Sequence, residues 1–262
     1  MKNYVITGAS SGIGLALKKM LEADGGRVID VSIVGGDIVC DLATVDGRKY
    51  AVTEIHRLCP DGLDGLVCCA GVPGTHKSFP AMMSLNFYGA VAIAEGCLDL
   101  LAMKKGACVL TSTFSIAEGY NIPDIAYLAN TDNSEEQVRQ IVGAMDQNDI
   151  GIGSAVYITS KYALTVWMRR HAVKWGAKRV RINCVAPGTT NTPMVAGMDD
   201  VSKYMLNSLQ IPIKYRESLM LEPEEVANVM KFLLSPEASA IHGSLLFADG
   251  GTECGINTER IY

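Results

Sequence analysis

The sequence predicts an α/β fold, a doubly wound parallel sheet of about seven strands with helices on both faces. Short apolar runs alternate with helical patterns along the chain, which is typical of strands connected by crossover helices. A glycine-rich turn also follows a strand that begins almost at the first residue. Because no internal repeat or linker interrupts the 262 residues, we expect a single domain over residues 1–262.

The composition limits the class of protein. Apolar residues make up 48% of the chain and the net charge is −5, which argues against nucleic acid or a membrane surface as a partner. No basic stretch precedes an apolar leader, and no apolar run approaches the ~20 residues of a membrane span, so we expect a cytoplasmic protein. The eight cysteines form no Cys-x-x-Cys pair, which favours buried free thiols and predicts no metal site.

The first strand and the turn after it predict a dinucleotide site. Residues 2–6 have a strand pattern, residues 7–14 read Thr-Gly-Ala-Ser-Ser-Gly-Ile-Gly, and a helix with Leu17, Met20 and Leu21 follows. Glycines let the backbone approach a pyrophosphate, whose charge lies at the helix N-terminus. The spacing is Gly-x-x-x-Gly-x-Gly rather than Gly-x-Gly-x-x-Gly. The predicted phosphate-binding residues are Gly8, Ser10, Ser11, Gly12, Ile13 and Gly14.

The second strand, over residues 28–33, bears on the form of the cofactor. An acidic residue usually meets the adenosine ribose about 20 positions after the glycines. Counting from Gly14 leads to Ser32, and Asp30 lies two residues earlier. Ser32 neither binds the ribose as a carboxylate would nor repels a 2′-phosphate, and no Arg or Lys follows it. Both NAD(H) and NADP(H) stay open, and we lean to NAD(H).

The remaining elements complete the alternation of strands and helices. Further strands are expected at residues 38–40, 63–69, 107–111, 181–185 and 244–248. Helices are expected at about 44–58 and 83–103, and Pro223 opens another one. In a parallel sheet of this kind, ligands bind at the carboxyl ends of the strands.

Tyr157 and Lys161 carry the strongest chemical signal. Two residues four apart share one face of a helix, so the ammonium would lie beside the phenol. A free phenol titrates near pH ~10, and a neighbouring cation favours the phenolate, so the phenol could exchange a proton near neutrality. The alternative is an ordinary pair on an amphipathic helix.

Motifs in the same order along nearly the whole chain resemble the short-chain dehydrogenase/reductase family. The matching positions are 7–14, Asp41-Leu42, Cys68-Cys69-Ala70-Gly71 in place of Asn-Asn-Ala-Gly, Asn86, the Ser at the end of the fifth strand, Tyr157 with Lys161, 187–193 and 247–251. The resemblance implies a Rossmann-like fold and an NAD(P)-dependent oxidoreductase that interconverts an alcohol and a ketone.

The family's catalytic tetrad corresponds to Asn86, Ser112, Tyr157 and Lys161. By resemblance, Tyr157 is the acid or base, Ser112 holds the substrate oxygen, Lys161 lowers the pKa of the phenol and binds the nicotinamide ribose, and Asn86 supports a proton path. Ser112 is farther from the Tyr than in simple members, and Thr111 and Thr113 could replace it under a one-residue slip. The resemblance also predicts cofactor contacts at Ser32, Asp41, Leu42, Cys69, Ala70, Gly71, Pro187, Gly188, Thr190 and Thr192.

Residues 118–153 form an insertion before the helix of Tyr157. Ser134-Glu135-Glu136-Gln137 has the spacing of a capping box, and Val138, Ile141, Val142 and Met145 follow at helical intervals, so we expect a helix at about 135–145. The insertion could be a surface excursion, a pocket wall or a subunit contact. Family members commonly form tetramers through neighbouring helices, so an insertion there predicts a homodimer.

Residues 194–221 correspond to the family's substrate lid and are rich in Met and Leu. Such a lid suits a large apolar ligand, although these residues could also pack on the protein itself. The Cys-Ala-Gly variant and the insertion are similar to bacterial 3α-hydroxysteroid dehydrogenase/carbonyl reductases. We expect a small apolar secondary alcohol or ketone as substrate. Within this class the specific expectation is a 3α-hydroxysteroid or a bile acid. The alternatives are carbonyl reduction of another apolar ketone and a nucleotide-binding sensor without catalysis, whereas an epimerase is disfavoured.

Overall fold

The computed structural model describes residues 1–198, 200, 211–213 and 220–260, and its described strands form one parallel sheet. The sheet has seven strands, as predicted, and their order is β3-β2-β1-β4-β5-β6-β7. The strands are β1 (Asn3–Thr7), β2 (Arg27–Ser32), β3 (Ile38–Val39), β4 (Gly65–Cys68), β5 (Ala107–Thr111), β6 (Arg181–Pro187) and β7 (Leu245–Ala248).

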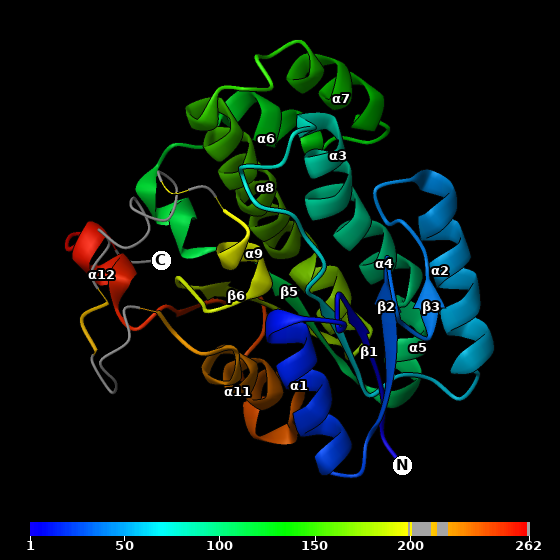
Figure 1. The fold of residues 1–262 in the computed structure, drawn as a ribbon. Coiled ribbons are helices and arrows are strands. Elements are labelled where there is room, and N and C mark those ends of the chain that lie inside the picture. The colour runs from blue at the N-terminus through cyan, green and yellow to red at the C-terminus, as the bar shows by residue number, and fades with distance from the viewer. Residues whose placement is uncertain (199, 201–210, 214–219, 261–262) are drawn as a thin grey trace.

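Helices cover both faces of this sheet (Figure 1). They are α1 (Gly12–Ala23), α2 (Val45–Leu58), α3 (Phe79–Met83), the π-helix η1 (Ser84–Gly89), α4 (Ala90–Gly96), α5 (Leu98–Lys104), the 3₁₀ helix η2 (Phe114–Glu118), α6 (Pro123–Ala129), α7 (Glu135–Gly143), α8 (Ile150–Ala177), α9 (Pro193–Ala196), α11 (Pro223–Leu234), the 3₁₀ helix η3 (Pro236–Ala238) and α12 (Thr252–Ile256).

Two apolar cores fix the orientation of the strands. Val5 of β1 faces one core, with α2, α4 and α8, and Ile6 faces the other, with α1 and α11. Both side chains are fully buried, as expected when side chains alternate along a strand that is covered on both faces. β1 pairs with β2 on one side and with β4 on the other, so the glycine turn emerges near the middle of the sheet.

The single helix expected at 83–103 is wrong in detail, because its first turns are π-helical and it ends and restarts at Cys97. The first turns after α3 wind as the π-helix η1, which contains Asn86. The second break lies at Cys97, whose φ of −102° and ψ of 0° end α4. Just before it, Gly96 packs so closely on Val52 of α2 that a Cβ would lie 2.5 Å from Cγ2 of that side chain.

The insertion folds as two helices, of which only α7 was expected. α7 begins at Glu135 as predicted, but the capping box does not form, because the Ser134 hydroxyl pairs with the Tyr88 phenol at 2.9 Å and makes no capping bond. Val138 and Val142 are fully buried, whereas Ile141 is 38% exposed and does not belong to the buried stripe. α6 and α7 lie together at one end of the molecule, where α6 contacts α8 and α7 contacts α3 and η1 (Figure 1).

The predicted lid at 194–221 lies partly outside the described residues. Its described part includes α9, and Ile211 is buried. Of the residues that predicted an apolar lid, Tyr204, Met205, Leu206, Leu209 and Tyr215 lie outside it.

In the part of the chain that the structure describes, no single helix has the length and apolar character needed to cross a bilayer. One bent pair, Phe79–Gly96 with Leu98–Lys104 at 47°, meets that test of length and composition only when taken together.

Candidate active site

Helix α8 brings Lys161 to the carboxyl end of β5. The Lys161 side chain is buried, and its Nζ donates a hydrogen bond to the carbonyl of Thr111, the last residue of the strand, at 2.9 Å. The helix packs on the sheet through the apolar side chains around it, including Leu164 and Met168. An amine is therefore fixed at the edge where ligands of a parallel sheet bind.

Burial has the largest effect on the pKa of both Lys161 and Tyr157. It lowers the pKa of Lys161 to about 8, against a smaller opposing effect of the thiols of Cys69, Cys184 and Cys68. Burial also raises the pKa of Tyr157, and a hydrogen bond with the Thr113 hydroxyl opposes this rise. The Lys161 ammonium is bound to the Thr111 carbonyl. The lowering of the phenol's pKa by Lys161 stays a prediction.

The hydroxyls of Ser112 and Thr113, which follow β5, have different partners. The Ser112 hydroxyl turns into α8, where it lies 2.9 Å from Oγ1 of Thr165. The Thr113 hydroxyl opposes the rise in the pKa of Tyr157, and it also accepts a hydrogen bond from the Ser115 amide. Which of the two holds a substrate oxygen stays a prediction, with Thr113 as the alternative recognised in the sequence.

Asn86 is held beside the buried amine. Its Oδ1 accepts from the Val72 amide at 2.9 Å, and its Nδ2 donates to the Val72 carbonyl at 3.0 Å. A Cβ on Gly71 would lie 3.0 Å from Asn86 Oδ1 and 3.4 Å from Lys161 Nζ. Asn86, Gly71 and Lys161 therefore meet, although they are far apart in the sequence.

The glycine turn packs closely on the segments that follow β4 and β6. Gly8 has a φ of +75°, and a Cβ there would lie 2.9 Å from Cα of Ala70. Gly12 has a φ of +53°, and a Cβ there would lie 3.1 Å from Cγ2 of Thr192. Ser11 makes no side-chain cap at the start of α1, so first-turn amides are free to bind an anion. The turn, the end of β4 and the chain after β6 thus form one cradle that fits the cofactor.

Asp30 and Ser32 are both buried in β2 and bind to each other. The Asp30 carboxylate accepts hydrogen bonds from the hydroxyls of Ser10, in the glycine turn, and of Ser32. Lys18 Nζ lies 3.8 Å from the same carboxylate. The contact of Ser32 with the ribose stays a prediction. Asp30, which lies 18 positions after Gly12, is the acidic residue nearest to the glycine turn on this strand.

The other predicted cofactor residues lie at the ends of neighbouring strands. The amides of Cys69 and Ala70 both donate to the Thr7 hydroxyl at 3.1 Å, which joins the ends of β4 and β1. Asp41 caps its own turn through the Ala43 amide, and Leu42 is buried. After Pro187, which ends β6, Thr190 donates to the Gly188 carbonyl at 2.8 Å.

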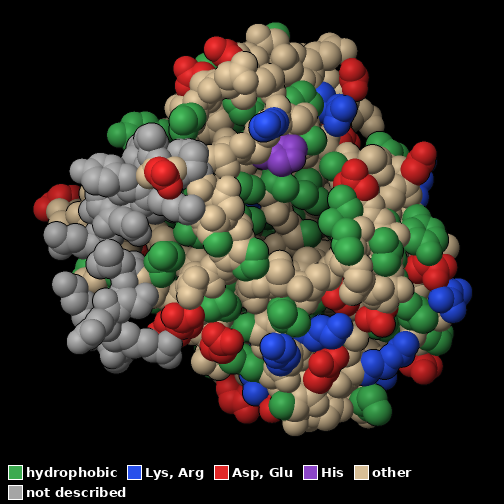
Figure 2. Space-filling view, in the orientation of Figure 1, with side chains coloured by type: hydrophobic (Ala, Val, Ile, Leu, Met, Phe, Trp, Pro, Cys, Tyr) green, Lys and Arg blue, Asp and Glu red, His purple; other side chains and the backbone are tan. Residues whose placement is uncertain are grey.

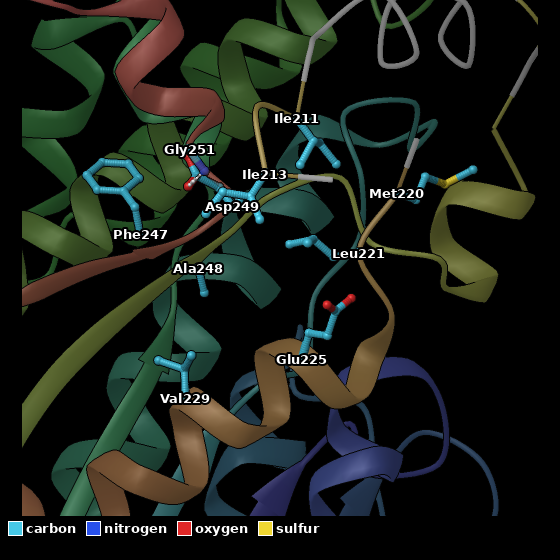
Figure 3. Close-up of a pocket in the computed structure, with 11 residues that line it drawn as sticks. Ile211, Ile213, Met220, Leu221, Glu225, Val229, Phe247, Ala248, Asp249 and Gly251 are labelled. Atoms are coloured by element: carbon cyan, nitrogen blue, oxygen red, sulfur yellow. Dashed lines mark hydrogen bonds between the residues drawn. The ribbon is translucent and has the colours of Figure 1, made fainter. Parts of the chain in front are cut away.

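The surface is hollowed near this region. Figure 2 shows a depression between α1 and α3, the helices labelled in Figure 1, with apolar side chains inside it. A separate cavity of about 290 Å³ lies at the end of β7 against α11 (Figure 3). Ile211, Ile213 and Met220 of the predicted lid line it, but none of the tetrad residues does, so we do not assign it as the catalytic pocket. Among the described side chains, no group of three metal-ligating residues gathers.

Proteins of known sequence resemble this chain over nearly its whole length. The 3-alpha-hydroxysteroid dehydrogenase/carbonyl reductase of Comamonas testosteroni is 36% identical over 258 residues, which cover 97% of each chain. The coniferyl-alcohol dehydrogenase of Pseudomonas sp. (strain HR199 / DSM 7063) is 28% identical, over 95% of this chain and 96% of that protein. A family model described as enoyl-(acyl carrier protein) reductase matches residues 141–253.

Solved structures agree with these similarities. The 3-alpha-hydroxysteroid dehydrogenase from Pseudomonas sp. B-0831, complexed with NADH, superposes with a TM-score of 0.89 at 32% identity, and the match covers 99% of this chain and 100% of that one. The ligand-free aldohexose dehydrogenase of Thermoplasma acidophilum gives a TM-score of 0.70 at 23% identity, over 96% and 93%, which supports the fold alone.

Proposed function

The chain belongs to the short-chain dehydrogenase/reductase family of NAD(P)-dependent oxidoreductases, and we propose that it oxidises the 3-hydroxyl of a steroid or bile acid, or reduces the ketone. The observation that carries this proposal is the convergence of the Tyr157 phenol, the Thr113 hydroxyl and the Lys161 amine at the carboxyl end of β5.

Each of these groups has a role in moving one proton. Thr113 and Tyr157 donate hydrogen bonds to the substrate oxygen, and Tyr157 gives or takes the proton there. Lys161, whose pKa is about 8, replaces that proton near neutrality, while Asn86 holds the Val72 backbone beside it. The nicotinamide, when bound, supplies or accepts the hydride.

The substrate class is supported by similarity and by apolar surface. Two similar proteins, at 36% and 32% identity, are named as 3-alpha-hydroxysteroid dehydrogenases. The depression between α1 and α3 contains apolar side chains, which suits a ligand with a large apolar body (Figure 2).

NAD(H) is the proposed cofactor. A carboxylate at the end of the second strand accepts hydrogen bonds from ribose hydroxyls and repels a 2′-phosphate. Asp30 supports this proposal because its carboxylate, although buried, is the one that borders the glycine turn through Ser10. The similar Pseudomonas structure also holds NADH. Lys18 lies close enough to Asp30 to weaken the repulsion, so we expect a preference rather than exclusion of NADP(H).

A panel of steroids, bile acids and small ketones, each assayed with NAD(H) and NADP(H), tests both parts of the proposal. We expect the highest kcat/KM for a 3-hydroxysteroid or 3-ketosteroid with NAD(H). Asp30→Ser should move the ratio of kcat/KM towards NADP(H). Turnover of sugars or short polar alcohols, with none on steroids, would contradict the substrate class, and an unchanged cofactor ratio would contradict the role of Asp30.

A further inference from the structure

Arg48 of α2 connects three segments that are distant in the sequence. Its side chain is only 8% exposed. Nε donates to the Leu42 carbonyl at 2.8 Å, and Nη2 donates to the carbonyls of Ala43 and Ser84 at 3.1 Å each. Nη1 and Nη2 also donate to the two carboxylate oxygens of Glu135 at 2.7 and 2.6 Å. All three guanidinium nitrogens are thus engaged.

Two of these segments border the candidate active site. Leu42 and Ala43 belong to the turn after β3, where a cofactor contact is predicted. Ser84 is the first residue of the π-helix η1, which carries Asn86. A Cβ on Gly89, at the end of η1, would lie 3.0 Å from the Leu42 carbonyl and 3.3 Å from the Ser84 carbonyl. The turn and the π-helix are therefore packed together, and Arg48 bonds to both.

The third segment is the insertion. Glu135 is the first residue of α7, and 87 positions separate it from Arg48. The start of α2 and the end of α3 lie close to the end of the molecule that α7 occupies (Figure 1). Arg139 of α7 donates to the Ser84 hydroxyl at 2.8 Å, and that hydroxyl in turn hydrogen-bonds to the Glu135 carboxylate. The insertion thus contacts the first residue of the π-helix directly and through Arg48.

The chemistry of this network favours positioning over simple packing. Burial alone would raise the pKa of Glu135, but the hydrogen bonds from Arg48 and Ser84 outweigh it, so the pKa is below its usual value and the pair is ionised. A buried ion pair gains little stability over apolar residues of the same volume, but a bidentate pair fixes one geometry. π-Helical turns are rare and frequently occur at functional sites, and the one that begins at Ser84 carries Asn86.

We propose that the insertion is a positioning element for the active site: Glu135 orients Arg48, and Arg48 holds both the 41–43 turn and the π-helix of Asn86. The proposal rests on the proposed function only for the roles of the turn and of Asn86. Glu135 and Arg48 are positioning residues, because they act through Leu42, Ala43 and Ser84.

Glu135→Gln tests the proposal, with Glu136→Gln as the matched control on the same helix. The Glu136 side chain is 76% exposed and lies 3.9 Å from Arg139, so its loss leaves Arg48 untouched. Hydrogen exchange of the cofactor-free proteins is measured first. We expect faster exchange in Glu135→Gln at 41–43 and 84–89, and wild-type exchange there in Glu136→Gln. Equal exchange in all three proteins would overturn the proposal.

Binding of NAD(H) and steady-state kinetics then test the consequence for the site. In Glu135→Gln we expect weaker binding and a kcat lowered by about 10-fold, since misplacement of a catalytic group by 1 Å can cost far more. Glu135→Asp keeps the charge, but its side chain is too short for the same bidentate contact. It should therefore give a smaller loss of NAD(H) affinity and of kcat, and it serves as the test variant if Glu135→Gln does not fold.

The outcomes separate this proposal from the function on which it rests. Absence of NAD(H) and NADP(H) binding by the wild-type protein would overturn the proposed function and this inference together. Normal binding by the wild type, with unchanged affinity, kcat and pH profile in a folded Glu135→Gln protein, would overturn the inference alone. A lowered melting temperature without those changes would show a merely structural ion pair.

Discussion

At the scale of single residues, the hydroxyls of Ser112 and Thr113, just after β5, have different partners. Thr113→Val removes the hydroxyl that meets Tyr157, and we expect kcat to fall by about 10²-fold, as for other donors to a reacting oxygen. Ser112→Ala removes a bond to Thr165, which keeps its own bond to the Lys161 carbonyl at 3.0 Å, so most of kcat should remain. Steady-state kinetics on both variants measure this. The reverse result would restore the register expected from the sequence.

The buried amine of Lys161 makes the free energy of unfolding depend on pH. The pKa is 10.5 for a free Lys and about 8 in the folded protein, so the unfolded chain binds more protons between these values. The stability of the wild type relative to Lys161→Met should therefore rise by about 3 kcal/mol as pH increases from 8 to 10.5, and stay constant below 8. Denaturant unfolding of both proteins across this range checks the prediction. A constant difference would mean that Lys161 is not desolvated.

The residues of the site could be predicted where one motif fixes both spacing and chemistry. Tyr157, Lys161 and the glycines follow from such motifs. The proposed choice of Thr113 instead of Ser112 depends on which way each side chain turns after β5. The proposed choice of Asp30 instead of Ser32 depends on a count that is uncertain by two positions. Arg48 could not be recognised, because its partner Glu135 is brought to it only by the packing of the insertion.

At the scale of elements, the buried stripe of α7 can be tested directly. Val142 is fully buried, so Val142→Asp should lower the free energy of unfolding by about 3 kcal/mol or more, as for a charge placed in a core. Ile141→Asp, at a position 38% exposed, should cost about 1 kcal/mol or less. Denaturant unfolding measures both. Equal losses would mean that Ile141 also packs in an interface.

The alternation of strands and helices was predictable because apolar runs and turns are local signals. All seven strands occur within two residues of their predicted bounds, although the fourth, Gly65–Cys68, is shorter than predicted at both ends. The breaks in the helix before β5 were not predictable, since its apolar pattern continues through both of them. Ser84, the first residue of the π-helix, has hydrogen-bond partners in α2 and α7, which are distant in the sequence.

At the scale of the whole molecule, the insertion bears on assembly. α6 and α7 pack on α3, η1 and α8 of the same chain, where members of the family commonly form one of their tetramer contacts. With that surface covered, we propose a homodimer in solution. Light scattering over a range of concentrations tests it, and a tetramer that persists on dilution would contradict it.

Oxidation of a 3-hydroxysteroid by wild-type protein and by Tyr157→Phe, with NAD⁺ present, tests the central claim most directly. The substitution keeps the aromatic ring but removes the hydroxyl, which interacts with Thr113. The formation of NADH, followed by its absorbance, should be rapid with the wild type and slower by about 10²–10⁴-fold or more with the folded variant. Equal rates in the two proteins would contradict the assignment of Tyr157 as the acid or base.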